Sequence, residues 1–196
     1  MNEGKGDKMK KRIIAAVILI FCVVGAFAAV TAVEPQVSME AATKKKVPSI
    51  NTVYSAVKKA YGEDYIPNMR LSEDEANTRY GISGSWYSGV IAEIPMMNVH
   101  SDELVIVKAK NSSAKKKIKS ALTAYQKKLK EDTFQYPANQ LKLQASRVYV
   151  KGNYVCFFSL GMISDAQAAQ SDESKVIEAY KAENAKAVKA IQKLYK

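Results

Sequence analysis

The pattern of apolar and polar positions predicts two helices at the start of the folded part of the chain. Ser49 precedes a stretch whose apolar residues recur at helical spacing, and Gly62 follows that stretch as a stop signal. A second helix is expected to begin at Ser72, which has the spacing of a capping box with Glu75, and to end before Gly81. Both helices need an apolar surface against which to pack.

Two hairpins are predicted to supply that surface. The first joins a strand over residues 86–99 to a strand over residues 103–110 through a polar turn that contains His100. Pro95 cannot donate a hydrogen bond to a neighbouring strand, so we expect its strand to lie at a sheet edge or to contain a bulge there. The second hairpin is the stretch RVYVKGNYVCFFSLG, over residues 147–161.

A two-residue turn at Gly152-Asn153 fixes which residues of the second hairpin share a face. Opposed residues point to the same side of the sheet, so each face can be read from the sequence. One face is expected to lie in the core, and we expect a helix to cover the other, with an exposed binding face as the alternative. The core face carries Val148, Val150, Val155 and Phe157, and the other carries Arg147, Tyr149, Lys151, Tyr154, Cys156 and Phe158.

Helical spacing also predicts a lysine-rich helix over residues 111–130, a short helical turn near residues 139–143 and a long amphipathic helix at the carboxy-terminal end. The predicted fold class is α+β, with the order α-α-β-β-α-β-β-α. It consists of an antiparallel sheet of two hairpins with helices packed on one face, preceded by an N-terminal membrane-targeting helix.

The first third of the chain indicates export. A basic n-region at residues 1–12 precedes 21 apolar residues, 13–33, which is the length of a membrane-spanning helix. A cleaved signal peptide and a retained anchor both fit this stretch. A linker at residues 34–48, an α+β domain at 49–163 and an amphipathic helix at 164–196 follow. Either reading places the domain outside the cytoplasm, secreted or anchored to the cell membrane, with the membrane as a partner at least during export.

Charge suggests what the exported part binds. Residues 43–196 contain 25 Lys and Arg against 15 Asp and Glu, and no acid lies between Leu104 and Lys130. Such an excess attracts anionic partners, although a lysine-rich face that only maintains solubility is the alternative. Outside the membrane the expected partners are an anionic wall polymer or an envelope protein, and not nucleic acid. The expected partner surface comprises Lys115, Lys116, Lys119, Lys127, Arg147, Tyr149, Lys151 and Tyr154.

The residues that carry most enzyme and metal chemistry are sparse. Cys22 lies in the apolar run, where bulky Phe21 argues against a lipidated cysteine, and Cys156 lies in a predicted strand, so no disulfide is expected within the domain. The lone histidine, His100, lies in a polar turn without the partners of a metal site. Ser83 lacks the strand-elbow-helix setting of a nucleophilic serine. We expect no cofactor, no metal and no catalytic residues.

Four segments together resemble a known family. They are RYGI at residues 79–82, AEIPMMNVHSDELVIVKAK at 92–110, FQYPANQLKL at 134–143 and VYVKGNYVCFFSL at 148–160. In this order and spacing they resemble the domain of unknown function 4358 family, over about residues 50–160. The resemblance implies a compact α+β domain in secreted proteins and lipoproteins of clostridia-like bacteria, and it implies no activity.

The leading functional hypothesis is a non-catalytic, extracytoplasmic binding module for an anionic envelope component or a partner protein. A wall-directed hydrolase is the first alternative, with a site assembled from Glu93, Asp102, Glu103 and loop serines, because glycoside chemistry uses a pair of carboxylates. A structural subunit of a membrane complex is the second.

Overall fold

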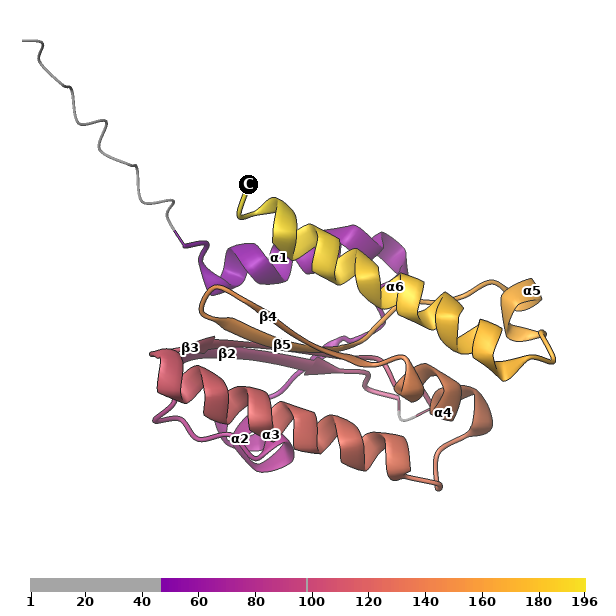
Figure 1. The fold of residues 1–196 in the computed structure, drawn as a ribbon, viewed down its shortest axis with the longest axis horizontal. Coiled ribbons are helices and arrows are strands. Elements are labelled where there is room, and N and C mark those ends of the chain that lie inside the picture. The colour runs from indigo at the N-terminus through magenta and orange to yellow at the C-terminus, as the bar shows by residue number, and fades with distance from the viewer. Residues whose placement is uncertain (1–46, 98) are drawn as a thin grey trace, which may run out of the picture. The chain divides into compact units, whose positions relative to one another are not determined.

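Five antiparallel strands form the centre of the computed structural model, which describes residues 47–97 and 99–196 (Figure 1). Strands β2 (Tyr87–Ile94) and β3 (Glu103–Ala109) form the first hairpin, and β4 (Arg147–Lys151) and β5 (Tyr154–Ser159) form the second. β3 pairs with β5, and the two-residue strand β1 (Met69–Arg70) pairs with β2. The strand order is β1-β2-β3-β5-β4, so β4 lies at one edge of the sheet.

Helices cover both faces of this sheet. α1 (Ile50–Tyr61) and α6 (Glu173–Lys193) pack on one face, whereas α2 (Glu73–Tyr80) and α3 (Ser112–Glu131) pack on the other (Figure 1). The expectation of helices on one face is therefore wrong. The physical reason lies in β3 and β5, whose side chains are apolar and buried on both sides, so that each side needs a covering layer.

The helix signals in the sequence act as predicted. The Ser49 hydroxyl accepts a hydrogen bond from the Thr52 amide at 3.1 Å, and Ser72 and Glu75 form a complete capping box. Asn111 caps α3 by accepting from the Ala114 amide at 2.8 Å. Gly81 ends α2 in the left-handed region, with φ of 64°, which a residue with a Cβ adopts at a cost.

The second hairpin has the predicted register. Lys151 is paired with Tyr154, and Val148 is paired with Phe157. The core face packs against Ile118 and Leu122 of α3. The other face is also covered, as we expected, because Cys156 and Phe158 are fully buried in the cluster that contains α1 and α6.

Several boundaries differ from the predicted ones. The strand that was expected to include Pro95 ends at Ile94, and it lies between β1 and β3 rather than at an edge, with its irregularity at Tyr87 to Gly89. A strand of two residues, such as β1, leaves no pattern in a sequence. The short helix near residue 139 is α4 (Pro137–Gln144). The stretch 164–196 contains α5 (Asp165–Ala168) and then α6, and the short helix η1 (Gly62–Asp64) follows α1.

The N-terminal predictions lie outside the described residues. These are the n-region 1–12, the membrane-targeting helix 13–33 with Cys22, and the linker as far as residue 46. Within residues 47–97 and 99–196, no helix is both long enough and apolar enough to span a membrane.

Candidate functional site

Three buried carboxylates lie around the β2–β3 hairpin, and they face different sides of the sheet. Glu93, near the end of β2, is paired with Leu104, the neighbour of Glu103 on β3. Because successive side chains of a strand point to opposite faces, Glu93 lies on the α1 side and Glu103 lies on the α3 side. The sheet therefore separates the two residues that a carboxylate-pair hydrolase would need together.

Glu93 is held by three donors from the α1 side. Its Oε1 accepts from the Tyr54 hydroxyl at 2.9 Å and from Arg70 Nε at 3.0 Å, and its Oε2 accepts from the Tyr65 hydroxyl at 2.6 Å. Burial, followed by the hydrogen bond to Glu93, raises the pKa of Tyr65. Tyr65 therefore stays a protonated donor, and the cluster ties α1 and β1 to the end of β2.

Glu103 is held in the same way on the other face. Its Oε1 accepts from Arg79 Nε at 2.8 Å and from the Tyr80 hydroxyl at 2.6 Å, and Tyr125 donates to its Oε2 at 2.9 Å. Burial and the nearby Glu103 charge raise the pKa values of Tyr80 and Tyr125. The two tyrosine rings meet edge to face at 4.9 Å between centroids. This cluster joins α2 and α3 to the start of β3.

Asp102 forms the third buried pair. Lys142 Nζ of α4 lies 2.6 Å from its Oδ2, and the two side chains are only 7% and 1% exposed for Lys142 and Asp102, respectively. Burial raises the pKa of Asp102, although the Lys142 charge opposes that rise. Lys142 also lies 5.6 Å from the centre of the Tyr180 ring of α6. The pair therefore links the β2–β3 loop to two helices.

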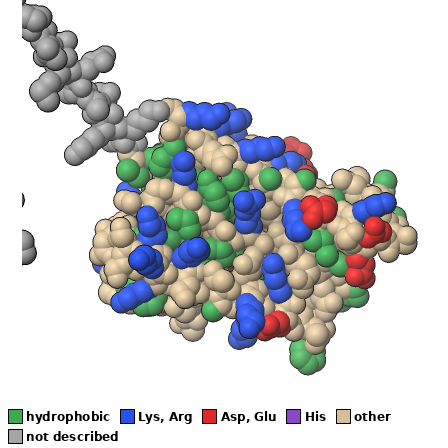
Figure 2. Space-filling view, viewed as in Figure 1, with side chains coloured by type: hydrophobic (Ala, Val, Ile, Leu, Met, Phe, Trp, Pro, Cys, Tyr) green, Lys and Arg blue, Asp and Glu red, His purple; other side chains and the backbone are tan. Residues whose placement is uncertain are grey.

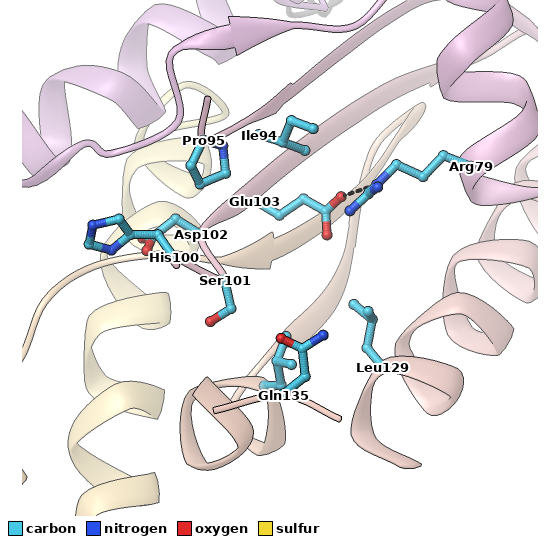
Figure 3. A pocket seen from close by; sticks show the side chains of 10 residues that line it. Arg79, Ile94, Pro95, His100, Ser101, Asp102, Glu103, Leu129 and Gln135 are labelled. Atoms are coloured by element: carbon cyan, nitrogen blue, oxygen red, sulfur yellow. Dashed lines mark hydrogen bonds and ion pairs between the residues drawn. The ribbon is translucent and has the colours of Figure 1, made fainter. Parts of the chain in front are cut away.

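A cavity of about 250 Å³ opens beside two of these clusters (Figure 3). Arg79 and Glu103 reach toward each other across its upper part, Ser101 and Gln135 lie below, and His100 and Asp102 lie to one side. Ser101 is within hydrogen-bond distance of Asn139, and Gln135 donates to Asp132. The lining comprises Arg79, Ile94, Pro95, His100, Ser101, Asp102, Glu103, Leu129, Gln135 and Leu143.

The other side chains that were weighed for catalysis are engaged or buried. Cys156 is fully buried, and burial raises the pKa of its thiol, so the nucleophilic thiolate is disfavoured at neutral pH. The hydroxyls of Ser83 and Ser85 lie 2.9 Å apart and bond to each other. Within the described ranges, no group of three or more His, Cys, Asp and Glu side chains could hold a metal ion.

Three of the predicted partner residues lie together on the outer side of α3. Lys116, Lys119 and Lys127 are exposed and line a shallow hollow of about 510 Å³, together with Ser120, Thr123 and Ala124. Lys127 also lies 3.7 Å from Glu131 one turn later. Small and hydroxyl-bearing side chains between the lysines leave room for a ligand to approach the helix.

The structure divides the remaining predicted residues between surface and core. Lys115 Nζ donates to the Gly152 carbonyl at 3.0 Å, which places the start of α3 beside the β4–β5 turn. Arg147 is exposed, and Lys151 is half-buried, 5.3 Å from the Tyr195 ring centre. We refer to six of the predicted residues as the lysine face: Lys115, Lys116, Lys119, Lys127, Arg147 and Lys151. Figure 2 shows Lys and Arg side chains spread over the side that presents α3, β4 and α6, with Asp and Glu mostly toward the end that carries α5.

The two predicted tyrosines do not belong to an open surface. Tyr154 as a partner residue is wrong, because its side chain is fully buried and its hydroxyl donates to the Pro48 carbonyl at 2.7 Å. Tyr149 is half-buried, with its ring 6.3 Å from that of Phe158. Both belong to the hairpin face that α1 and α6 cover.

Sequence reasoning missed the tyrosines that hold Glu93 and Glu103. Tyr54 lies 39 positions from Glu93, and Tyr125 lies 22 positions from Glu103. No local spacing connects such residues, and only an acid placed inside an apolar strand signals that buried donors must exist. The sequence also gave no sign that Lys181 of α6 would lie near α3.

Comparison with protein families gives one match. A family model described as Domain of unknown function (DUF4358) matches residues 60–160, which contain the β-sheet, α2, α3 and α4. No curated protein and no solved structure matches the chain.

Proposed function

The chain belongs to the DUF4358 family, a domain of unknown function, and we propose that this member is a non-catalytic binding module of the cell envelope. In this proposal the domain lies outside the cytoplasm, either secreted or anchored through residues 13–33. It binds an anionic envelope polymer through the lysine face. An acidic partner protein is the competing occupant, which the experiment below distinguishes.

The observation that carries the proposal is the set of cations on α3 without ionic partners. Lys116 and Lys119 are exposed, and neither forms an ion pair within the described residues. They flank the same hollow, so their charges add over a short length of helix. Several like charges on one face attract a polyanion more strongly than they attract simple counterions, and that attraction weakens as salt is added.

The absence of a hydrolase site supports a binding role. Glu93 and Glu103 lie on opposite faces of the sheet, and each accepts hydrogen bonds from one arginine and two tyrosines. A carboxylate whose oxygens are already occupied has little capacity to activate water or protonate a leaving group. We therefore assign both carboxylates to structure.

The location rests on the first 33 residues. Their basic cluster followed by 21 apolar residues is the arrangement of a signal peptide or a membrane anchor. Outside the membrane, wall polymers and lipid headgroups provide repeated negative charges. The lysine face would meet such a polymer along the length of α3.

A sedimentation assay with purified cell wall tests this function. The full chain should sediment with wall and should be released as salt is raised from about 50 mM to about 500 mM, because screening shortens the range of its charges. Lys116→Glu/Lys119→Glu/Lys127→Glu should abolish retention. The matched control Lys59→Glu/Lys175→Glu/Lys189→Glu makes the same change in net charge on exposed residues of α1 and α6.

Equal loss in both triple variants would show that only net charge matters and would overturn the role of α3. Salt-independent retention would overturn the electrostatic basis. Retention that disappears when wall proteins are removed, while the polymer remains, would identify a protein partner instead.

A further inference from the structure

A second basic feature lies where the carboxy-terminal ends of α3 and α4 meet α6. It is a recess of about 240 Å³ at the start of the edge strand β4. Three of its lining side chains are cations and none is an acid. The lining comprises Lys130, Gln144, Ala145, Ser146, Arg147, Lys181 and Asn184.

The uncharged side chains of the recess are committed to the fold. The Asn184 side chain accepts from the Leu160 amide at 3.0 Å and donates to the Ala145 carbonyl at 3.2 Å. Gln144 Nε2 donates to the Lys130 carbonyl at 3.0 Å, which holds the end of α3 against α4. These bonds make a fixed wall, so the donors left for a ligand are those of the three cations.

The cations of the recess are incompletely neutralised. Lys181 Nζ lies 2.6 Å from Glu178 Oε1, and both side chains of that pair are solvent-exposed. Within the described residues, neither Lys130 nor Arg147 forms an ion pair. The half-buried Lys130 is also close enough to Lys181 that burial and the Lys181 charge lower its pKa. A bound anion would relieve this repulsion.

We propose that the recess between α3, α4, β4 and α6 binds the phosphate group of a small phosphate ester. A phosphate ester carries up to two negative charges, which matches a site of three cations with one acid at its margin better than a single carboxylate does. Arg147 adds a planar pair of donors that fits phosphate oxygens. The volume equals that of about eight liquid waters, which leaves space beside the phosphate for part of the group that it esterifies.

The site goes beyond the proposed function and does not depend on it. Only Arg147 belongs both to the recess and to the lysine face. Loss of polymer binding in an α3 variant would leave the recess intact, and an empty recess would leave the α3 lysines free to bind polymer. The two proposals can therefore fail separately.

Calorimetric titration of the full chain with glycerol phosphate tests the recess. Arg147→Gln should weaken binding about tenfold or more, because it removes a hydrogen-bonding charge worth about 1.5–3 kcal/mol. Lys130→Gln, in a different element, should also weaken it. Lys189→Gln, an exposed lysine of α6 outside the recess, is the matched control and should bind as the unmodified chain does.

Two further arms identify the source and the specificity of the phosphate. Inorganic phosphate should compete with glycerol phosphate, whereas acetate at equal ionic strength should not. Vesicles containing a phosphomonoester lipid should bind in an Arg147-dependent manner if the ester is a headgroup. The proposal is overturned if no probe binds saturably, if acetate competes equally, or if Lys189→Gln loses as much affinity as Arg147→Gln.

Discussion

The inside and the outside of the domain differ in how their charges are paired. Inside, Glu93, Glu103 and Asp102 each contact a cationic side chain within 3.0 Å. Outside, the exposed Lys116 and Lys119 of α3 have no ionic partner within the described part of the chain. Folding demands the first arrangement, because an unpaired buried charge is strongly unfavourable. It does not demand the second, so the surface cations are where binding is to be sought.

The largest effect is expected at the buried pair of Lys142 and Asp102. Lys142→Met leaves Asp102 without its partner and should lower the free energy of unfolding by about 3–5 kcal/mol. Chemical denaturation at neutral pH measures this loss. A loss of under about 1 kcal/mol would mean that the pair is not buried as the structure shows it.

The pH dependence of that variant tests the cause of the loss. Burial raises the pKa of Asp102 above its unfolded value, so the folded state holds the proton more tightly, and stability from this group falls as pH rises through that window. Without Lys142 the pKa of Asp102 should rise further. The deficit of Lys142→Met should therefore shrink as pH is lowered from about 8 to about 5. A deficit that stays constant would point to lost packing rather than to an unpaired charge.

A middle-sized effect should separate the two glutamate clusters. Glu103→Gln should lower the free energy of unfolding by about 1–3 kcal/mol, because it removes the charge that Arg79, Tyr80 and Tyr125 surround. Glu93→Gln should lower it less, because Tyr54 and Tyr65 are only half-buried whereas Tyr80 is 2% exposed. Parallel urea titrations of the two variants give the order, and the reverse order would contradict this ranking of burial.

The smallest effect on stability is expected on the lysine face. Lys116→Gln/Lys119→Gln removes two exposed charges and should change the melting temperature by less than about 2 °C. Differential scanning calorimetry measures it, with Glu103→Gln as the comparison. A drop as large as that of Glu103→Gln would mean that α3 needs these lysines to fold.

Local signals in the sequence predicted much of the fold. Ser49, Ser72 and Asn111 cap the helices that they were expected to cap, and Gly152-Asn153 forms the two-residue turn that sets the hairpin register. Each of these features depends on residues a few positions apart. Helices on both faces, in contrast, depend on how much apolar surface β3 and β5 expose together, which no single segment shows.

The candidate site was predictable only for its charge. The lysines of α3 are visible as a run without acids, and Lys116, Lys119 and Lys127 do share a surface. The recess of Lys130, Arg147 and Lys181 was not predictable, because its members come from three elements that only the folded chain brings together. Tyr154 was misplaced because a strand residue beside a lysine resembles a mixed surface, whereas α1 and α6 bury that face.

The central claim is that the interior charges serve folding and the α3 cations serve binding. The most direct test measures the affinity of the full chain for a long polyphosphate as a function of salt, for the unmodified protein, Lys116→Gln/Lys119→Gln and Glu103→Gln. The lysine variant should bind more weakly with a shallower salt dependence and unchanged stability, because fewer counterions are released on binding. Glu103→Gln should bind with the same affinity and the same salt dependence while being less stable. Unchanged affinity in the lysine variant, or a loss of affinity confined to Glu103→Gln, would contradict the claim.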